Sequence, residues 1–167
     1  EELANIKDLL GSFTTSFSTS GSNRCKNVSS GASHINGTVL YPGEEFSAYE
    51  TVSPFTEANG YAMAGSYLNG EVVDSMGGGI CQVSSTLYAA MCDALLPVIE
   101  RYPHSSHVSY IPVGMDATIS EAGGKDLKFI NIGQDPLKIV AETNEGTMTV
   151  SIYLVSKETL ETVMCLQ

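Results

Sequence analysis

The stretch "GGGICQVSSTLYAAMCDALL", residues 77–96, holds the clearest structural signal in this sequence of 167 residues. Its apolar residues recur at the spacing of one helix face: Val83, Leu87, Ala90, Met91 and Ala94. We therefore predict a helix over 83–95, which Pro97 prevents from continuing. The three glycines before it, Gly77, Gly78 and Gly79, allow backbone angles that other residues avoid, which predicts a tight turn.

Cys81 lies in the first turn of this predicted helix, where the chemistry of a thiol changes. The free N–H groups and the helix dipole there favour negative charge and so stabilise a thiolate. Backbone N–H groups of residues 79–82 could hold the oxyanion of an acyl-transfer intermediate, with the Gln82 side chain as a further donor. The alternative is a closely packed glycine turn that happens to contain a thiol.

A thiol nucleophile needs a base, and the candidates are His104 and His107, on a segment that we predict to be extended. Asp116 and Asp126 are the candidates for a carboxylate that orients the base. A cysteine on a helix, followed along the chain by a histidine and an aspartate on strands, is also the order in papain-like and transglutaminase-like folds. The plainer interpretation is that His104 binds a backbone carbonyl and that Asp116 caps a turn.

Other polar residues near Cys81 have both a binding and a structural interpretation. Ser84 and Ser85 could line a substrate site, but hydroxyls at a helix start commonly face solvent or bind the backbone. Tyr88 fits the rim of the core. Arg101 could hold a substrate carboxylate with both arms of its guanidinium.

The rest of the chain predicts one α+β domain, residues 1–167, with helices packed on an antiparallel sheet. We expect a helix over 1–10 that ends at Gly11, and another before Gly37. Hairpins are predicted at Asn69-Gly70 and within 143–147. Strands are predicted at the start of 12–23, as two short segments around the Pro-Gly turn of 38–52, and at 107–113, 116–120, 126–132, 137–143 and 147–155.

Composition narrows the function classes. Lys and Arg total 8 against 19 Asp and Glu, for a net charge of −11, so nucleic acids and other phosphate polymers are poor partners. No apolar run approaches the ~20 residues of a membrane span. The N-terminal residues lack the basic and apolar segments of a signal peptide, so we expect none in this sequence.

The cysteines and histidines show no metal-site spacing, and we expect neither a metal nor another cofactor. Of the four cysteines, Cys92 and Cys165 lie among apolar neighbours, which predicts buried, unreactive side chains. Cys25 carries no such indication, and the sequence does not decide whether any of these three is in a disulfide.

Several long motifs occur together in one order: "LGSFTTSFS", "NRCKNV", "INGTVLYPGEEFSAYETVSPFTEANGYAMA", "GGGICQVSSTLYAA", "ERYPHSSHVSYIPVGMDAT" and "DLKFINIGQDPLKI". Over about 11–153 the chain thereby resembles the VanW-like domain, which is named for an accessory protein of vancomycin-resistance clusters. The resemblance implies an extracellular or cell-envelope protein of a Gram-positive bacterium, whose relatives often carry anchors or wall-binding modules elsewhere. It implies no established activity.

The resemblance also ranks the candidate residues. It favours Cys81 over the other cysteines and His104 over His107, because these two match the pattern of the family. The other matching positions are Gly77, Gly78, Gly79, Gln82, Ser84, Ser85, Leu87, Tyr88, Glu100, Arg101, Ser105, Asp116 and Asp126.

Three functions remain open from the sequence. The first is a cysteine peptidase-like or transpeptidase-like enzyme on peptidoglycan peptides or their precursors, in which Cys81 attacks, His104 takes the proton and Asp116, or else Asp126, orients the imidazole. The second is a non-catalytic domain that binds peptidoglycan or assembles the wall. The third is a metal site formed by Cys81, His104 and an aspartate. The oligomeric state is not indicated.

Overall fold

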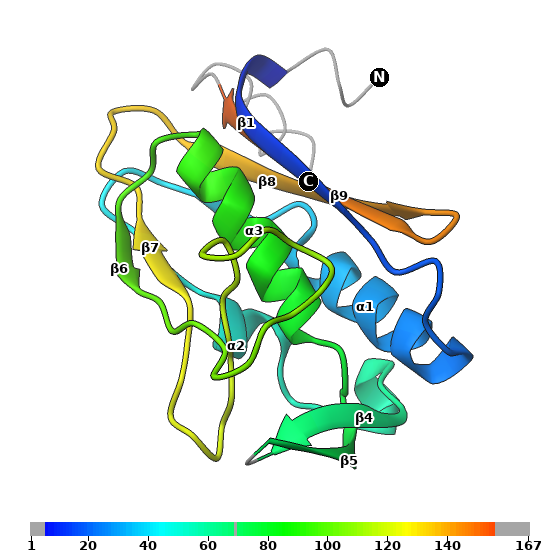
Figure 1. Cartoon of the computed structure of the whole chain (residues 1–167). Coiled ribbons are helices and arrows are strands. Elements are labelled where there is room, and N and C mark those ends of the chain that lie inside the picture. Colours follow the sequence, from blue (N-terminus) through cyan, green and yellow to red (C-terminus); the bar gives the residue numbers. More distant parts are fainter. Residues whose placement is uncertain (1–5, 69, 156–167) are drawn as a thin grey trace.

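The computed structural model describes residues 6–68 and 70–155 (Figure 1). Its largest sheet has the strand order β1-β9-β8-β2, and the neighbouring strands are antiparallel. The bounds of these strands are β1 Ile6–Ser16, β2 Val39–Leu40, β8 Leu137–Asn144 and β9 Thr147–Val155. Helices α1 (Ser22–Ile35) and α3 (Cys81–Asp93) pack against this sheet, α1 on β8 and α3 on β1 and β9.

Smaller elements complete the fold. A second antiparallel sheet has the order β3-β7-β6, and β4 and β5 form a separate two-stranded hairpin. The bounds are β3 Glu45–Ser47, β4 Met63–Leu68, β5 Glu71–Met76, β6 Val98–Glu100 and β7 Lys128–Ile130; the short helix α2 covers Ala48–Val52 and a 3-10 turn covers Glu57–Asn59. The α+β class and the antiparallel sheets are thus confirmed. No helix in the described ranges has the length and apolar character needed to cross a bilayer.

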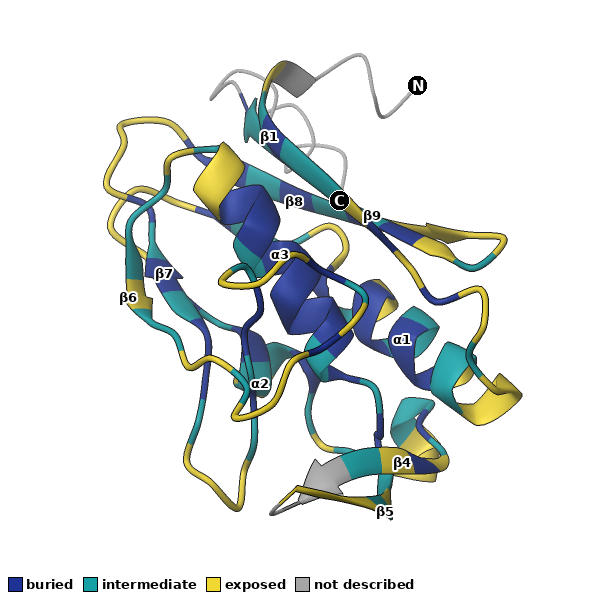
Figure 2. Cartoon of the chain, in the orientation of Figure 1, coloured by how far each residue is buried: buried dark blue, intermediate teal, exposed yellow. Residues whose placement is uncertain are grey.

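Helix α3 is the centre of the core, and most of its residues are buried (Figure 2). Val83, Leu87 and Met91 are at most 1% exposed and belong to one cluster with residues of α1 and of the main sheet. The predicted apolar face is therefore confirmed, and Cys81, predicted to lie in the first turn, is the first residue of the helix.

The glycine turn before α3 is required by close packing. A Cβ atom at Gly78 would lie 2.3 Å from the backbone oxygen of Ala64. Gly77 and Gly79 have φ angles of +81° and +97°, which side chains rarely adopt. The plainer interpretation of the three glycines, a closely packed turn, is thus confirmed.

The helix predicted over 1–10 is wrong where the structure describes it. Residues 6–10 belong to β1, because Ile6–Ser16 pairs with β9, with register shifts at positions 7 and 10, and this long-range pairing outweighs local helix propensity. Gly11 is a contact residue and caps no helix: a Cβ there would lie 2.4 Å from the backbone nitrogen of Ala94, at the C-terminal end of α3. Residues 1–5 lie outside the described ranges, as does Asn69 of the predicted β4–β5 hairpin turn.

Other predictions fail where distant partners decide the structure. The strands predicted at 107–113 and 116–120 are irregular, apart from a single bridge between Ser120 and Lys125. Residues 48–52 form α2, and Ser47 is its N-cap: the Ser47 side chain accepts from the N–H of Glu50. The two short strands around the Pro-Gly turn exist, but β2 pairs with β8 and β3 with β7.

Candidate functional site

The segment from Arg101 to Asp126, between β6 and β7, crosses the N-terminal half of α3 and is held there by side chains of the helix (Figure 1). Ser84 Oγ donates to the Ala117 carbonyl at 2.6 Å, and Ser85 Oγ accepts from the Ala117 N–H at 2.9 Å. Both serines are buried. The two serines therefore attach the loop to the helix. We call residues 116–119 of this loop the covering strip.

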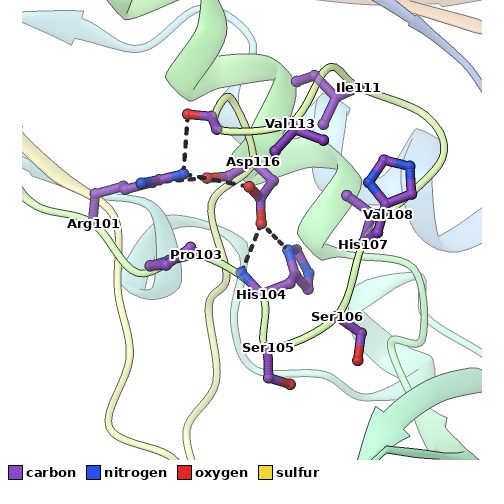
Figure 3. A pocket seen from close by; sticks show the side chains of 11 residues that line it. Arg101, Pro103, His104, Ser105, Ser106, His107, Val108, Ile111, Val113 and Asp116 are labelled. Atoms are coloured by element: carbon purple, nitrogen blue, oxygen red, sulfur yellow. Dashed lines mark hydrogen bonds and ion pairs between the residues drawn. The ribbon is translucent and has the colours of Figure 1, made fainter.

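His104 and Asp116 meet on this loop (Figure 3). Asp116 Oδ2 accepts from the His104 ring nitrogen Nδ1 at 2.6 Å and from the His104 backbone N–H at 2.7 Å. Burial opposes ionisation of Asp116, but these bonds from His104 outweigh it, and the pKa of the carboxyl is lowered. Since an ionised carboxylate only accepts, Nδ1 of His104 is the protonated ring nitrogen.

Arg101 completes this cluster. Its Nη2 lies 3.3 Å from Asp116 Oδ1, its Nε donates to the Asp116 carbonyl at 2.8 Å, and Nη2 also donates to the Gly114 carbonyl at 3.2 Å. The guanidinium also lies over the Tyr88 ring, 4.9 Å from its centroid. Arg101 thus orients Asp116, which differs from its predicted use as a free clamp for a substrate carboxylate.

A pocket of about 320 Å³ opens beside His104 and Asp116 (Figure 3). It combines the polar His104–Asp116 pair with apolar walls from Val108, Ile111 and Val113. His107 lines it too, so both histidine candidates border one cavity. Cys81 is not among the residues that line it.

The thiol of Cys81 lies beneath the covering strip. Its Sγ donates to the Ile119 carbonyl at 3.5 Å, and no hydrogen bond joins it to His104 within the described residues. Although Cys81 as a residue is partly exposed, burial of the sulfur raises the pKa of the thiol; the backbone hydrogen bond with Ile119 and the charge of Arg24 act in the opposite direction. The stabilised thiolate that the helix start predicts is therefore not found in this arrangement.

Two of the four backbone N–H groups predicted as oxyanion donors, and the Gln82 side chain, are engaged in other hydrogen bonds. The N–H groups of Ile80 and Gln82 donate to the carbonyls of Gly77 and Gly79. The Gln82 amide is buried; its Nε2 donates to Thr15 and Ser16, and its Oε1 accepts from Arg24 at 2.8 Å. Gln82 is thus a structural link between β1, α1 and α3 and does not point a free donor at a substrate.

Asp126 lies apart from the histidine. Its carboxylate accepts from the Ser47 hydroxyl and, at 2.8 Å, from the Tyr49 N–H, so it holds the start of α2. Of the two aspartate candidates, only Asp116 is bonded to His104 among the described residues.

The other cysteines differ from expectation at one position. Cys25, Cys81 and Cys92 are free thiols. Cys92, near the C-terminal end of α3, is exposed, so its predicted burial is wrong: its apolar sequence neighbours do not cover it. Cys165 lies outside the described residues. Within those residues, no three His, Cys, Asp or Glu side chains are grouped so as to hold a metal ion.

Sequence reasoning missed two residues beside Cys81. Arg24 of α1 bonds to Gln82, and its guanidinium carbon lies 5.8 Å from the ring centroid of Tyr110. The Tyr110 hydroxyl in turn lies 3.3 Å from Ser85 Oγ, and burial raises the pKa of this phenol. Both residues reach α3 from remote segments, and no local pattern marks them.

The sequence matches a known family of proteins. The family model described as VanW like protein matches residues 23–153, and the chain belongs to this family. It is 40% identical over 154 residues to Uncharacterized protein YoaR of Bacillus subtilis (strain 168), covering 92% of this chain and 50% of the relative.

A second relative carries a functional name. The chain is 32% identical over 118 residues to Vancomycin B-type resistance protein VanW of Enterococcus faecalis (strain ATCC 700802 / V583), covering 65% of this chain and 41% of that protein. The chain thus spans half the length, or less, of these curated relatives. No solved structure matches it.

Proposed function

We propose that this domain acts in the bacterial cell envelope, outside the membrane, as a cysteine-dependent acyl transferase or amidase on peptidoglycan peptides. The observation that carries the proposal is the His104–Asp116 pair at the edge of a pocket, next to a helix that begins with Cys81. The vancomycin-resistance name of one relative supports a cell-wall substrate, since vancomycin acts on the cell wall.

The covering strip connects the residue that binds the Cys81 thiol to the residue that binds His104, and it is short. Cys81 is bonded to Ile119 at one end of the strip, and Asp116, which holds His104, is at the other. Three residue steps span at most about 11 Å even when fully extended. The order of the three residues and the cysteine at a helix start also match papain-like and transglutaminase-like enzymes, although His104 and Asp116 stand here on a loop and not on strands.

The chemistry follows from the protonation states. With Nδ1–H bonded to Asp116, the free Nε2 of His104 can take the thiol proton, and the sulfur then attacks the carbonyl carbon of an amide. The C–N bond breaks as the imidazolium returns its proton to the leaving amine, which leaves a thioester on Cys81. Water or a second amine then takes the acyl group and restores the thiol. The thiol must first leave its bond to Ile119.

One observation favours a second function, a domain that binds peptidoglycan peptides without reacting with them. The Cys81 thiol is bonded to a carbonyl, has a raised pKa and does not line the pocket. In that case the pocket beside His104 would hold the ligand and the thiol would have a structural role only.

Intact-mass spectrometry of the domain mixed with peptidoglycan stem peptides tests the enzyme directly. We expect a covalent adduct on the wild type and on the control Cys92→Ala, and none on Cys81→Ala. His104→Ala should lower the rate of adduct formation by at least about 100-fold, since it removes the general base. Absence of any adduct, with unchanged peptide binding by Cys81→Ala, would establish the binding domain instead.

A further inference from the structure

Arg24 contacts the chain on both sides of Cys81, in the glycine turn before α3 and in the first turn of the helix. Its Cγ would lie 2.7 Å from a Cβ at Gly79, so the side chain runs across that glycine. Its Nη1 then donates to Gln82 Oε1 at 2.8 Å and to Ser20 Oγ at 2.9 Å. Since Gly79 and Gln82 flank Cys81 in the sequence, the guanidinium lies beside the turn that carries the thiol.

The positive charge of Arg24 is not cancelled by a partner. Its hydrogen-bond acceptors, an amide and a hydroxyl, are neutral, and in the described part of the chain it forms no ion pair. This holds although the sequence has 19 Asp and Glu against 8 Lys and Arg. The charge is therefore free to act on a neighbouring anion.

We propose that Arg24 is a positioning residue for Cys81: it fixes the first turn of α3 through Gln82, and its charge favours the thiolate. The proposal rests on the proposed function, in which Cys81 is the nucleophile. It also explains why a buried amide is needed next to the cysteine, since Gln82 ties Arg24 to α3 and to β1 at once.

Charges from two elements act on the thiol. From α1, Arg24 lowers the pKa of Cys81, and from the loop Lys125 lowers it while Asp116 raises it. Arg24 has the largest effect of the three charges. Tyr110, over which Arg24 lies, stays neutral because burial raises its pKa.

The test is the pH profile of Cys81 alkylation by iodoacetamide, followed by peptide mapping so that each cysteine is read separately. We expect Arg24→Gln to raise the apparent pKa of Cys81 by about one pH unit, which is about tenfold less thiolate at neutral pH. Glutamine removes the charge and keeps an amide donor, but its side chain is two bonds shorter than that of arginine, so Arg24→Lys is needed to separate the charge from the bond to Gln82. Lys26→Gln is the matched control, because Lys26 is exposed on the same helix and the variant loses the same charge. It should leave the profile unchanged.

Arg24→Lys keeps the charge, and we expect its profile to stay close to that of the wild type. A profile of Arg24→Gln that coincides with the wild type overturns the proposal, as does an equal shift in Lys26→Gln. If Arg24→Gln does not fold, Arg24→Lys decides, since a full-unit rise with the charge retained would exclude the electrostatic role. These profiles need no substrate, so they stand apart from the test for a peptide adduct.

Discussion

The two sides of the loop that follows β6 are built in opposite ways. The side toward α3 is sealed: Ser84 and Ser85 bind the strip, and the Cys81 thiol is bonded to Ile119. The side toward solvent is open: His104, oriented by Asp116, borders a pocket. The fold thus presents an oriented imidazole and a thiol that is bonded to the backbone. Under the proposed mechanism, uncovering of the thiol is the step that the fold controls.

The largest effect on stability is expected at Gly78, where the turn before α3 has no room for a side chain. Gly78→Ala would place a Cβ 2.3 Å from the Ala64 oxygen, a backbone atom that cannot rotate away. We expect a loss of about 3 kcal/mol in the free energy of unfolding, measured by urea denaturation. Gly21→Ala is the control, because its φ is −65° and a Cβ there meets nothing within 4 Å. A Gly78→Ala variant as stable as the control would show that the turn is not packed as described.

On the solvent side of the loop, Asp116 holds both His104 and Arg101. Asp116→Asn removes the anion that binds His104 and Arg101, and we expect about 2 kcal/mol of destabilisation at neutral pH, measured by urea denaturation.

The effect should depend on pH. The folded pKa of Asp116 lies below the ordinary 3.8, so its contribution is complete above that value and is lost as the pH falls toward the folded pKa. The stability difference between wild type and Asp116→Asn should therefore shrink below about pH 4. A difference that stays constant from neutral pH into this acid range would contradict a role through the ionised carboxylate.

Sequence patterns predicted the elements whose signals are local. The periodic apolar residues of α3 and α1 and the alternation in β8 and β9 all correspond to observed elements. At the site, the hypothesis that Asp116 accompanies His104 agrees with the observed hydrogen bond, while their catalytic roles stay predictions.

The rest depended on partners from distant segments. Gln82 looks like a free donor in the sequence, but Thr15, Ser16 and Arg24 occupy its amide. Residues 107–113 and 116–120 are each predicted as strands, yet at Ala117 the backbone bonds to serine side chains of α3 and joins no strand ladder. Such pairings are set by the tertiary fold, which local periodicity does not encode.

The smallest effect on stability is expected at Ser85, which attaches the covering strip to α3. This variant also tests whether the strip controls access to the Cys81 thiol. Ser85→Ala leaves the buried N–H of Ala117 without its acceptor, at a cost of about 1.4 kcal/mol, so the strip should open about tenfold more often. We expect Cys81 to be alkylated about tenfold faster in this variant, while exposed Cys92 reacts quickly and equally in every variant. Ser106→Ala, an exposed position in the pocket wall, should change neither rate, which separates attachment of the strip from the pocket itself. If Ser85→Ala lowers stability but leaves Cys81 as slow as before, the strip does not control access to the thiol, and the thiol must be reached from the glycine turn instead.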